Sequence, residues 1–422
     1  MQEDLISEGG RSAQKGRAPQ DGFAGMPKIC YNKEAGIELT CFFHWEEKVT
    51  RRNPGRRDQK MWGMDLLILL IFMIPTLDME VRRKGSLDSY LEPRQTGQLK
   101  GLFALFVIVH HLVHRTEDGI GFPYFGNIGY LAVSFFFFIS GYGLMVQYMK
   151  KEEGYLETFL SNRLPKVAAP FAVGLVIYYA ANRILNSDFS LGTALQSFVT
   201  GKIYVSFSWY VIAIILFYLV FYAAARISKD QYKHLAFMIA VGLLVYSLLC
   251  HGLGFQKHWY KTCTNFLLGV VWGIYSEPIS KWLDKKWLPT ICFSLLGFVF
   301  FYVQVVQNKA QSMGYFLLIH YLSSAFFCIT VAALGKKVQL NSRLLTYLGD
   351  ISYEVYLSQG LAILFFRNDL WYQRSDYLFS VGVFLGSVLI AVLFHKINMF
   401  LLEPKKHHRY AVSFVELLKD KQ

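Results

Sequence analysis

Long apolar blocks, each of about 20 residues, recur along most of this chain and are separated by short charged loops. An α-helix needs about 20 consecutive apolar residues to cross the hydrocarbon core of a bilayer. A soluble chain of 422 residues would instead be expected to divide into about two or three domains with loop-rich boundaries. The pattern therefore predicts an all-α fold, a polytopic bundle of transmembrane helices in the lipid bilayer.

Ten strong blocks and one marginal block give the expected spans and divide the chain. The strong blocks lie near 98–114, 126–148, 167–185, 204–225, 234–253, 261–277, 287–306, 314–335, 344–366 and 377–402. The block over 62–77 is marginal in length for a span. We expect four parts: a disordered basic N-terminal extension (1–60), a short hydrophobic helix with a basic linker (61–94), a membrane domain (95–402) and a short basic cytoplasmic tail (403–422). Met61 directly precedes the first block, which favours a start of translation there.

Loops that are rich in lysine and arginine alternate along the chain with loops that are poor in them. If the loop before the first strong span is cytoplasmic, each inside segment holds three to five of these residues and each outside loop only one or two. Cytoplasmic loops of membrane proteins carry such an excess of basic residues. The alternation predicts a multi-pass protein of the cell membrane with a cytoplasmic C-terminus.

Charge and cysteine content exclude other functions. The net charge of +13 could indicate nucleic-acid binding in a soluble protein, but no such motif accompanies it, so we expect no nucleic acid. None of the six cysteines forms a CxxC pair, and four of them lie in or beside apolar segments. We therefore interpret them as buried apolar residues rather than as disulfides or metal ligands.

Three histidines stand in the stretch LKGLFALFVIVHHLVHRTED: His110, His111 and His114. An ionisable residue inside a span is expensive to insert, about 2.5–3.5 kcal/mol for a charged side chain, and is a functional candidate for that reason. His111 lies about 16 Å along the helix from Lys100, near the bilayer midplane, and His114 is one turn further out. His110 and His111 point about 100° apart, so they cannot both face the same neighbour.

The residues alone leave three interpretations of these histidines open. A histidine in a bundle interior can simply hydrogen-bond to a neighbouring helix. His110 and His114 have a metal-ligand spacing, but no HExxH motif appears and no Cys, Asp or Glu lies nearby in the span, so we expect no metal site. Histidine is also the residue that titrates near neutrality unaided, so a proton-transfer role is the third interpretation.

Five motifs in order resemble the membrane acyltransferase 3 family over about residues 95–400. KGLFALFVIVHH resembles its first-helix signature, in which a basic residue, here Lys100, precedes a histidine, here His111, by eleven positions. GYLAVSFFFFISGYGLM resembles the FFxxSG pattern, with Ser140. FLSNRLPKVAAPF resembles the RxxR-type motif, with Arg163 and Lys166. SWYVIAIILFYL and YLGDISYEVYLSQG resemble the Trp-aromatic-Leu helix and the late GxxSYxxYLxH helix.

The chain departs from the family pattern at two kinds of position. Lysine stands at Lys100 and Lys166, where the family often has arginine, which keeps the charge but loses the bidentate geometry. Gln359 stands where many members have histidine, and this argues against a second catalytic histidine there.

The resemblance implies an enzyme that transfers an acyl group, commonly acetyl, from acyl-CoA to a hydroxyl of a cell-envelope glycan, a lipid or a small molecule. Acyl transfer to an alcohol needs a base for the hydroxyl proton, donors for the oxyanion and anchors for the CoA phosphates. His111 fits the base. The phosphates can be held by Arg163 and Lys166, which share a helix face at the cytoplasmic end of a span, and by Lys100. Positive-inside topology explains the same basic residues equally well.

Polar residues on later spans are candidates for lining a cavity. Ser352, Tyr356 and Gln359 follow one another at i, i+4 and i+7, and a polar stripe in a span lines a cavity or a helix contact. Ser140 is expected to line the same cavity. Trp209 and Tyr210 are interpreted as structural or sugar-stacking. His320 and His395 are interpreted as structural.

A transporter or flippase of a small polar molecule or lipid-linked glycan is the alternative function. It too would show ten spans and intramembrane polar residues. Against it, the sequence shows no clear inverted repeat and no paired spans broken by Gly or Pro in corresponding halves.

Overall fold

The computed structural model describes part of the chain. It covers Met73 and residues 78–402, apart from 83–84, 88–89, 117–125, 151–153, 186–187, 200–202, 230, 308–311 and 368–374. The predicted extension 1–60, nearly all of the marginal block 62–77 and the tail 403–422 lie outside the described residues, so those predictions are not tested. All described residues belong to one compact unit, Arg57–Gln422.

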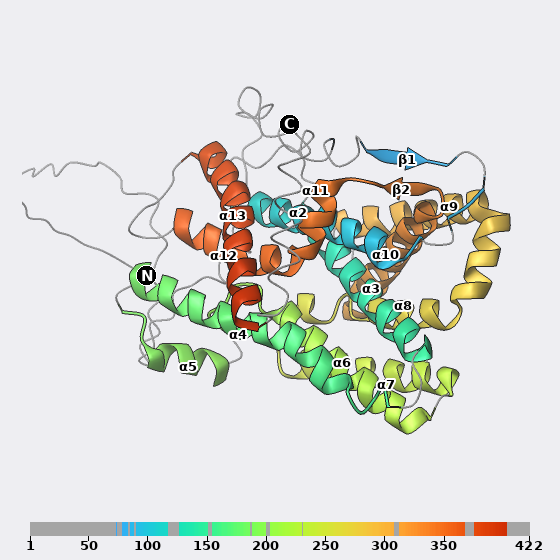
Figure 1. Ribbon diagram of the computed structural model, residues 1–422, viewed down its shortest axis with the longest axis horizontal. Helices are drawn as coiled ribbons and strands as arrows, with labels where there is room; N and C mark the ends of the chain where they lie inside the picture. The colour runs from blue at the N-terminus through green and yellow to red at the C-terminus, as the bar shows by residue number, and fades with distance from the viewer. Residues whose placement is uncertain are drawn as a thin grey trace, which may run out of the picture. The chain divides into compact units, whose positions relative to one another are not determined.

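Helices make up nearly all of the described chain, which confirms the predicted all-α fold (Figure 1). The long helices are α2 (Pro93–Val113), α3 (Ile128–Lys150), α4 (Phe159–Leu185), α6 (Trp209–Ser228), α7 (Tyr232–Gly252), α9 (Ser276–Val306), α10 (Met313–Gly335) and α13 (Asp376–Leu402). The shorter elements are β1 (Met79–Val81), α5 (Leu191–Val199), η3 (Lys257–Trp259), α8 (Thr264–Ile274), β2 (Val338–Leu340), α11 (Arg343–Asp350) and α12 (Ser352–Phe366).

Eight described helices are long and apolar enough to cross a membrane, and each coincides with a predicted span. The two remaining predicted spans are shorter or broken. The block 261–277 contains α8, which has only 11 residues and ends at Ile274. The block 344–366 is divided at Ile351 into α11 and α12. Arg343 and Asp350 keep α11 polar at both ends, which suits a short helix beside the bundle rather than the start of a span.

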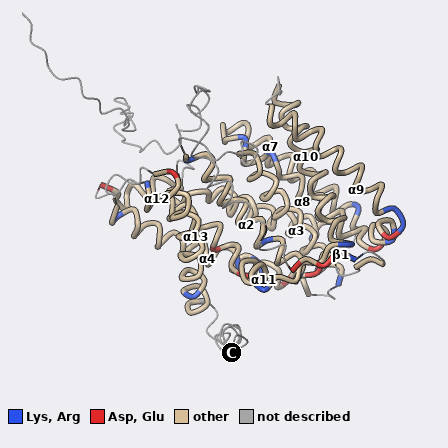
Figure 2. The backbone as a smooth tube through the Cα atoms, turned by 90° about the horizontal axis from the view of Figure 1, so that it is seen from above, with Lys and Arg blue, Asp and Glu red and all other residues tan. Residues whose placement is uncertain are grey.

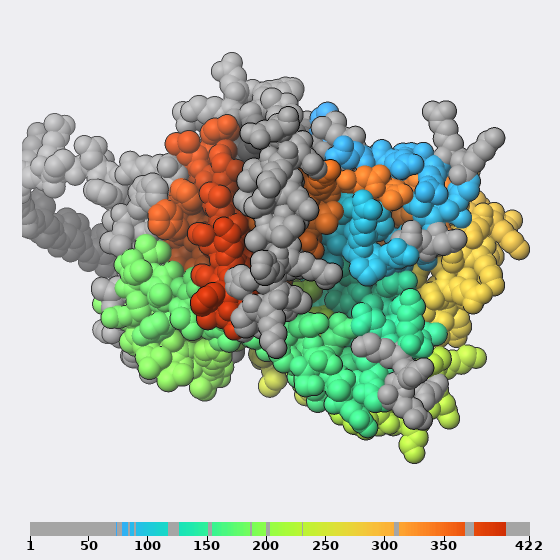
Figure 3. Space-filling model, viewed as in Figure 1, coloured from blue at the N-terminus to red at the C-terminus, as the bar shows by residue number. Residues whose placement is uncertain are grey.

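The helices differ in how deeply they are buried. In the most apolar 18-residue window, 78% of α3 and 56% of α2 is buried, against 17% for α4 and for α9. Large apolar side chains such as Val176 on α4 and Phe300 on α9 are exposed, as expected of side chains that face lipid. Helices α4 and α13 lie side by side on one face of the molecule (Figure 3), and Gly174 of α4 packs against the ring of Phe394 of α13. The histidine-bearing helix α2 is therefore an inner helix of the bundle.

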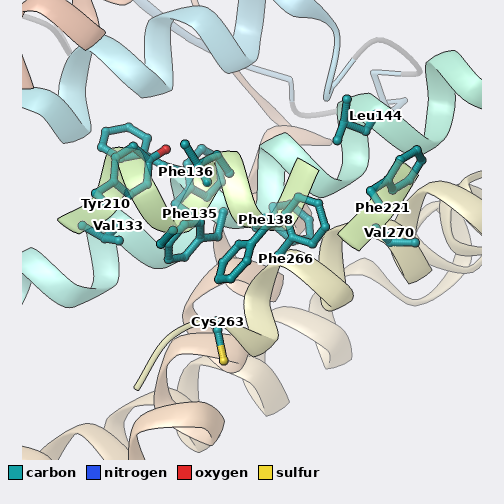
Figure 4. Packing of buried hydrophobic residues seen from close by; sticks show 14 of the residues in the cluster. Val133, Phe135, Phe136, Phe138, Leu144, Tyr210, Phe221, Cys263, Phe266 and Val270 are labelled. Carbon is teal, nitrogen blue, oxygen red and sulfur yellow. The ribbon is translucent and has the colours of Figure 1, made fainter. Parts of the chain in front are cut away.

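Two glycines let α3 and α8 pack backbone against backbone. A Cβ atom at Gly269 would lie 1.9 Å from the carbonyl oxygen of Phe138, and one at Gly141 would lie 2.1 Å from that of Phe266. Small residues permit such close helix contacts in membranes. Aromatic side chains of α3 surround the contact with partners from α6 and α8 (Figure 4). Gly141, which belongs to the FFxxSG motif, thus has a packing role.

A short segment before α2 is fixed to the α10–α11 connection. β1 pairs antiparallel with β2, with Met79 opposite Leu340. The Gln95 side chain extends this pairing, because its amide donates to the Leu340 carbonyl at 3.2 Å and accepts from the Leu340 N–H at 3.1 Å. We call these contacts, together with the ion pair described next, the N-terminal clamp.

A buried lysine completes the clamp. The Lys336 side chain is fully buried, and its ammonium donates to Ser280 Oγ at 2.6 Å and to Asp284 Oδ1 at 3.0 Å. Ser86, from the segment before α2, donates to the same Asp284 oxygen at 2.6 Å. Burial raises the pKa of the adjoining Tyr90 to about 12, and the Tyr90 ring lies 5.0 Å from the ammonium. Charged residues gather near β1, near α11 and in the N-terminal part of α9 (Figure 2).

Candidate functional site

The three histidines of α2 have different surroundings. The His110 ring packs on α3, where a Cβ added at Gly129 would lie 2.3 Å from it. His114 ends the helix, and its Nε2 donates to the Gly126 carbonyl at 2.8 Å. These two side chains therefore serve the contact between α2 and the start of α3. His111 points elsewhere, as the 100° rotation between successive residues requires.

His111 faces an aromatic ring from the segment before α6. Its imidazole stacks on Phe207 with 3.7 Å between ring centroids and 23° between ring planes. The side chain is half-buried, and neither ring nitrogen meets a hydrogen-bond partner among the described residues. Stacking occupies a ring face and leaves the edge, where the nitrogens lie, for another group. The arrangement suits a histidine that takes a proton from a bound molecule.

The backbone of Phe207 has an unusual conformation. Its φ of 63° lies in the left-handed region, which bulky residues rarely adopt. Such a conformation costs on the order of 1–3 kcal/mol and persists only where surrounding contacts enforce it. Here the Tyr356 hydroxyl donates to the Phe207 carbonyl at 2.6 Å. A residue of the late motif on α12 thus holds the residue that stacks on His111.

The predicted polar stripe of α12 is largely occupied by protein contacts. Ser352 Oγ donates to the Gly349 carbonyl at 2.8 Å, and Gln359 Nε2 donates to the Tyr356 carbonyl at 3.0 Å. Gln359 is fully buried, and its Oε1 has no partner within the described part of the chain. Ser352 and Tyr356 thus contribute to helix contacts, one of the two roles expected of such a stripe, and Gln359 keeps a buried acceptor without a partner among the described residues.

Ser140 lies among tyrosines in the interior. It lies close to the phenol groups of Tyr210 and Tyr218. The Tyr210 ring lies 5.2 Å from that of Tyr356, so these polar groups adjoin the residue that holds Phe207. The guanidinium of Arg163 lies close enough to Tyr218 to interact with it electrostatically. Ser140 therefore occupies an interior region between Arg163 and the His111 surroundings.

The three predicted cations have different environments. Arg163, at the start of α4, is half-buried and donates to the side-chain oxygen of Gln147. Lys166 follows three residues later on the same helix and is exposed. Lys100 is half-buried on α2 and interacts electrostatically with Asp350. The structure thus brings Lys100 to the α11–α12 junction and Arg163 to the tyrosine-lined region.

A buried carboxylate on α12 was not among the predicted site residues. Glu354 is 6% exposed, and its Oε1 accepts from His395 Nδ1 at 3.0 Å and from Asn398 Nδ2 at 3.1 Å. His395, interpreted as structural from the sequence, does join α13 to α12. A carboxylate inside an apolar helix is the signal that could have drawn attention to Glu354.

A histidine that the sequence did not single out lies near His111. His258, in η3, interacts electrostatically with His111, and its ring centroid is 5.0 Å from that of Trp209. Burial, and secondarily the nearby Lys261, lowers the pKa of His258 to about 3. The ring is therefore neutral at physiological pH and keeps one N–H donor and one acceptor. Its loop position, outside every apolar block, gave no sequence signal.

Comparison with known proteins identifies a family. A family model described as an acyltransferase domain matches residues 97–396. That range includes His111, Phe207 and Tyr356. No curated protein and no solved structure matches the chain significantly.

Proposed function

Because the chain belongs to the acyltransferase 3 family, a family of membrane acyltransferases, we propose that it moves an acyl group, most simply acetyl, from acyl-CoA to a hydroxyl of a glycan, a lipid or a small molecule. In this reaction His111 acts as the general base. It removes the proton from the acceptor hydroxyl as the oxygen attacks the thioester carbonyl. The imidazolium returns this proton to the departing sulfur, so CoA leaves as the thiol and the ester remains on the acceptor.

The different surroundings of the three histidines carry this proposal. His110 and His114 serve the contact between α2 and the start of α3, whereas the His111 ring nitrogens are free of partners in the described structure. A base must reach the proton that it removes, so an imidazole already engaged in packing is a poorer candidate. An inner helix of the bundle also keeps His111 away from lipid.

The CoA phosphates would meet basic residues at the cytoplasmic ends of α2 and α4. Lys100 and Arg163 are half-buried there and Lys166 is exposed. Guanidinium and ammonium groups bind phosphate oxygens through charge-assisted hydrogen bonds. The interior region with Ser140, next to Arg163, suits the polar part of the pantetheine arm. The buried, unpartnered Oε1 of Gln359 would accept from a hydroxyl of an acceptor molecule that enters the bundle.

The protein is a multi-pass membrane protein, and we place its C-terminus in the cytoplasm. The distribution of lysine and arginine between loops supports this orientation. Cysteines introduced at 278–286 should then react only with membrane-permeant thiol reagents. Reaction of intact cells with an impermeant reagent at these positions would reverse the orientation.

Label transfer by the purified protein tests the reaction. The protein in lipid vesicles, given acetyl-CoA labelled in the acetyl group, should release CoA and pass the label to hydroxyl-bearing acceptors drawn from a cell-envelope extract. A transporter or flippase would do neither. Failure of both CoA release and label transfer across glycan, lipid and small-molecule acceptors would reject the proposed function.

Arg163→Ala should raise the KM for acyl-CoA. A charge-assisted hydrogen bond to phosphate contributes about 1.5–3 kcal/mol, which corresponds to a roughly ten- to hundredfold increase. Lys166→Ala should act in the same direction. Initial rates over a range of acetyl-CoA concentrations would give the values, with protein in the membrane measured by immunoblot.

Lys233→Ala is the matched control for these variants. Lys233 is an exposed basic residue in the first turn of α7, on the same predicted side of the membrane. It should leave the KM unchanged. If the Arg163 and Lys166 double variant also keeps the KM of the unaltered protein, these two residues only direct topology.

A further inference from the structure

Phe207 is one of two non-glycine residues with positive φ in the described chain. The other, Lys229 with φ 42°, caps the C-terminus of α6, where a left-handed residue is common. Phe207 stands before the first turn of α6, where no capping rule asks for this conformation. Its strain must come from contacts elsewhere, and an enforced outlier is a reason to look for a function.

The segment before α6 is attached to α12 at two points. The Tyr356 hydroxyl holds the Phe207 carbonyl at 2.6 Å. Ser206 packs directly on Gly360, where an added Cβ would come within 2.5 Å of the serine Cβ. On α4, Tyr178 donates to the Leu357 carbonyl at 2.8 Å beside the same glycine, which fixes this part of α12 in turn. These contacts determine where the Phe207 ring lies.

We propose that Phe207 is a positioning residue for the reaction, held in its strained conformation by Tyr356 so that its ring fixes the imidazole of His111 with the nitrogens turned toward the acceptor. This inference rests on the proposed role of His111 as the base. It adds a residue that no motif of the sequence indicated, and it gives Tyr356 of the late motif a specific task.

Stacking explains how the Phe207 ring can position the imidazole of His111. With 3.7 Å between centroids, Phe207 prevents the imidazole from rotating about its side-chain bonds on that side. A reacting group displaced by about 1 Å can lose on the order of 10²-fold in rate. If Phe207 served only core packing, its replacement would lower the stability of the protein and leave kcat per folded molecule unchanged.

Three substitutions separate the ring from the backbone strain. Phe207→Gly removes the ring and fits the left-handed conformation without strain. Phe207→Leu removes the ring but keeps apolar volume, and Phe207→Tyr keeps the ring. We expect kcat to fall about tenfold or more in the glycine and leucine variants. The KM for acetyl-CoA should change little in both, and the tyrosine variant should retain most of the activity.

Lys229→Gly is the matched control. It relieves the same kind of backbone conformation at the other end of α6, away from His111. It should leave kcat unchanged. An equal loss in Lys229→Gly and Phe207→Gly would attribute the effect to α6 as a whole and overturn the proposal.

Tyr356→Phe tests the link from α12. It keeps the ring but removes the hydroxyl that holds the Phe207 carbonyl. We expect a smaller loss of kcat, and the double variant with Phe207→Gly should be no slower than Phe207→Gly alone, because both changes act on one arrangement. Multiplied losses in the double variant would show that Tyr356 does not act through Phe207.

A chemical probe gives a reading that does not depend on turnover. Diethyl pyrocarbonate modifies accessible imidazoles, and mass spectrometry can follow His111 and His114 separately. Loss of the Phe207 ring should speed modification of His111 in the glycine and leucine variants, with His114 unchanged. Unaltered kcat and unaltered His111 modification in Phe207→Leu would overturn the inference. If the parent protein transfers no acyl group, the proposed function fails, and the modification rates still decide whether Phe207 covers His111.

Discussion

Replacement of His111 by alanine or by glutamine should abolish acyl transfer while the protein still enters the membrane. A general base typically contributes about 10²–10⁴-fold to the rate, and neither replacement can accept a proton near neutral pH. Insertion should not suffer, because alanine is cheaper in a span than histidine and glutamine introduces no charge. The measurement is turnover of labelled acetyl-CoA, normalised to protein in the membrane.

The neighbouring histidines supply the controls. His110→Ala removes a ring that packs on Gly129, and His114→Ala removes a bond to the Gly126 carbonyl. Both changes should lower stability more than they lower turnover per folded molecule. Substantial activity in His111→Gln would refute the base assignment. Equal losses in all three variants, restored by added divalent metal, would indicate a metal site instead.

Gly269→Ala should prevent the protein from accumulating in a folded form. The new methyl group would lie 1.9 Å from the carbonyl oxygen of Phe138, and backbone cannot move aside as a flexible side chain can. Separating α3 from α8 would disturb the surrounding aromatic core. We expect a destabilisation of more than about 4 kcal/mol, seen as loss of the monodisperse peak in detergent size-exclusion chromatography.

Gly143→Ala is the matched control on α3. Apart from its chain neighbours and the adjacent backbone of α3 itself, no heavy atom of the described chain lies within 4 Å of a Cβ built there. Alanine inside a helix is favoured over glycine by roughly 0.5–1 kcal/mol, so this variant should be unchanged or slightly more stable. A Gly269→Ala protein that melts at the same temperature as Gly143→Ala would contradict the backbone contact between α3 and α8.

The apolar blocks predicted most of the helices because a bilayer imposes a length on each span. The same rule could not foresee the division at Ile351. Polar residues near a helix end look alike in sequence whether they are hydrated or belong to a separate short helix such as α11. Likewise, the apolar block 261–277 does not reveal that α8 is a short helix. Its 11 residues pack backbone against backbone on α3.

His111 could be singled out from the sequence because an ionisable residue in a span stands out against apolar neighbours. Phe207 could not be singled out, because nothing in the sequence shows which of the 36 phenylalanines has a left-handed backbone conformation. His258 reaches the site through a loop, and the distance from α2 in sequence hides that proximity. Residues brought together by tertiary contacts, rather than by spacing along one helix, were the part that sequence could not supply.

The N-terminal clamp also sets an order of assembly during synthesis. Gln95 and Leu340 are 245 positions apart, so the strand that Gln95 joins has not yet been made when α2 enters the membrane. At about 5–20 residues per second, translation needs roughly 12–50 s to deliver it. During that interval the segment carrying β1 and Ser86 lacks the partner strand and the ion pair that later hold it. Quality-control factors therefore have a defined period in which α2 is inserted but not yet held by these contacts. A chain truncated before Val338 would remain in that state.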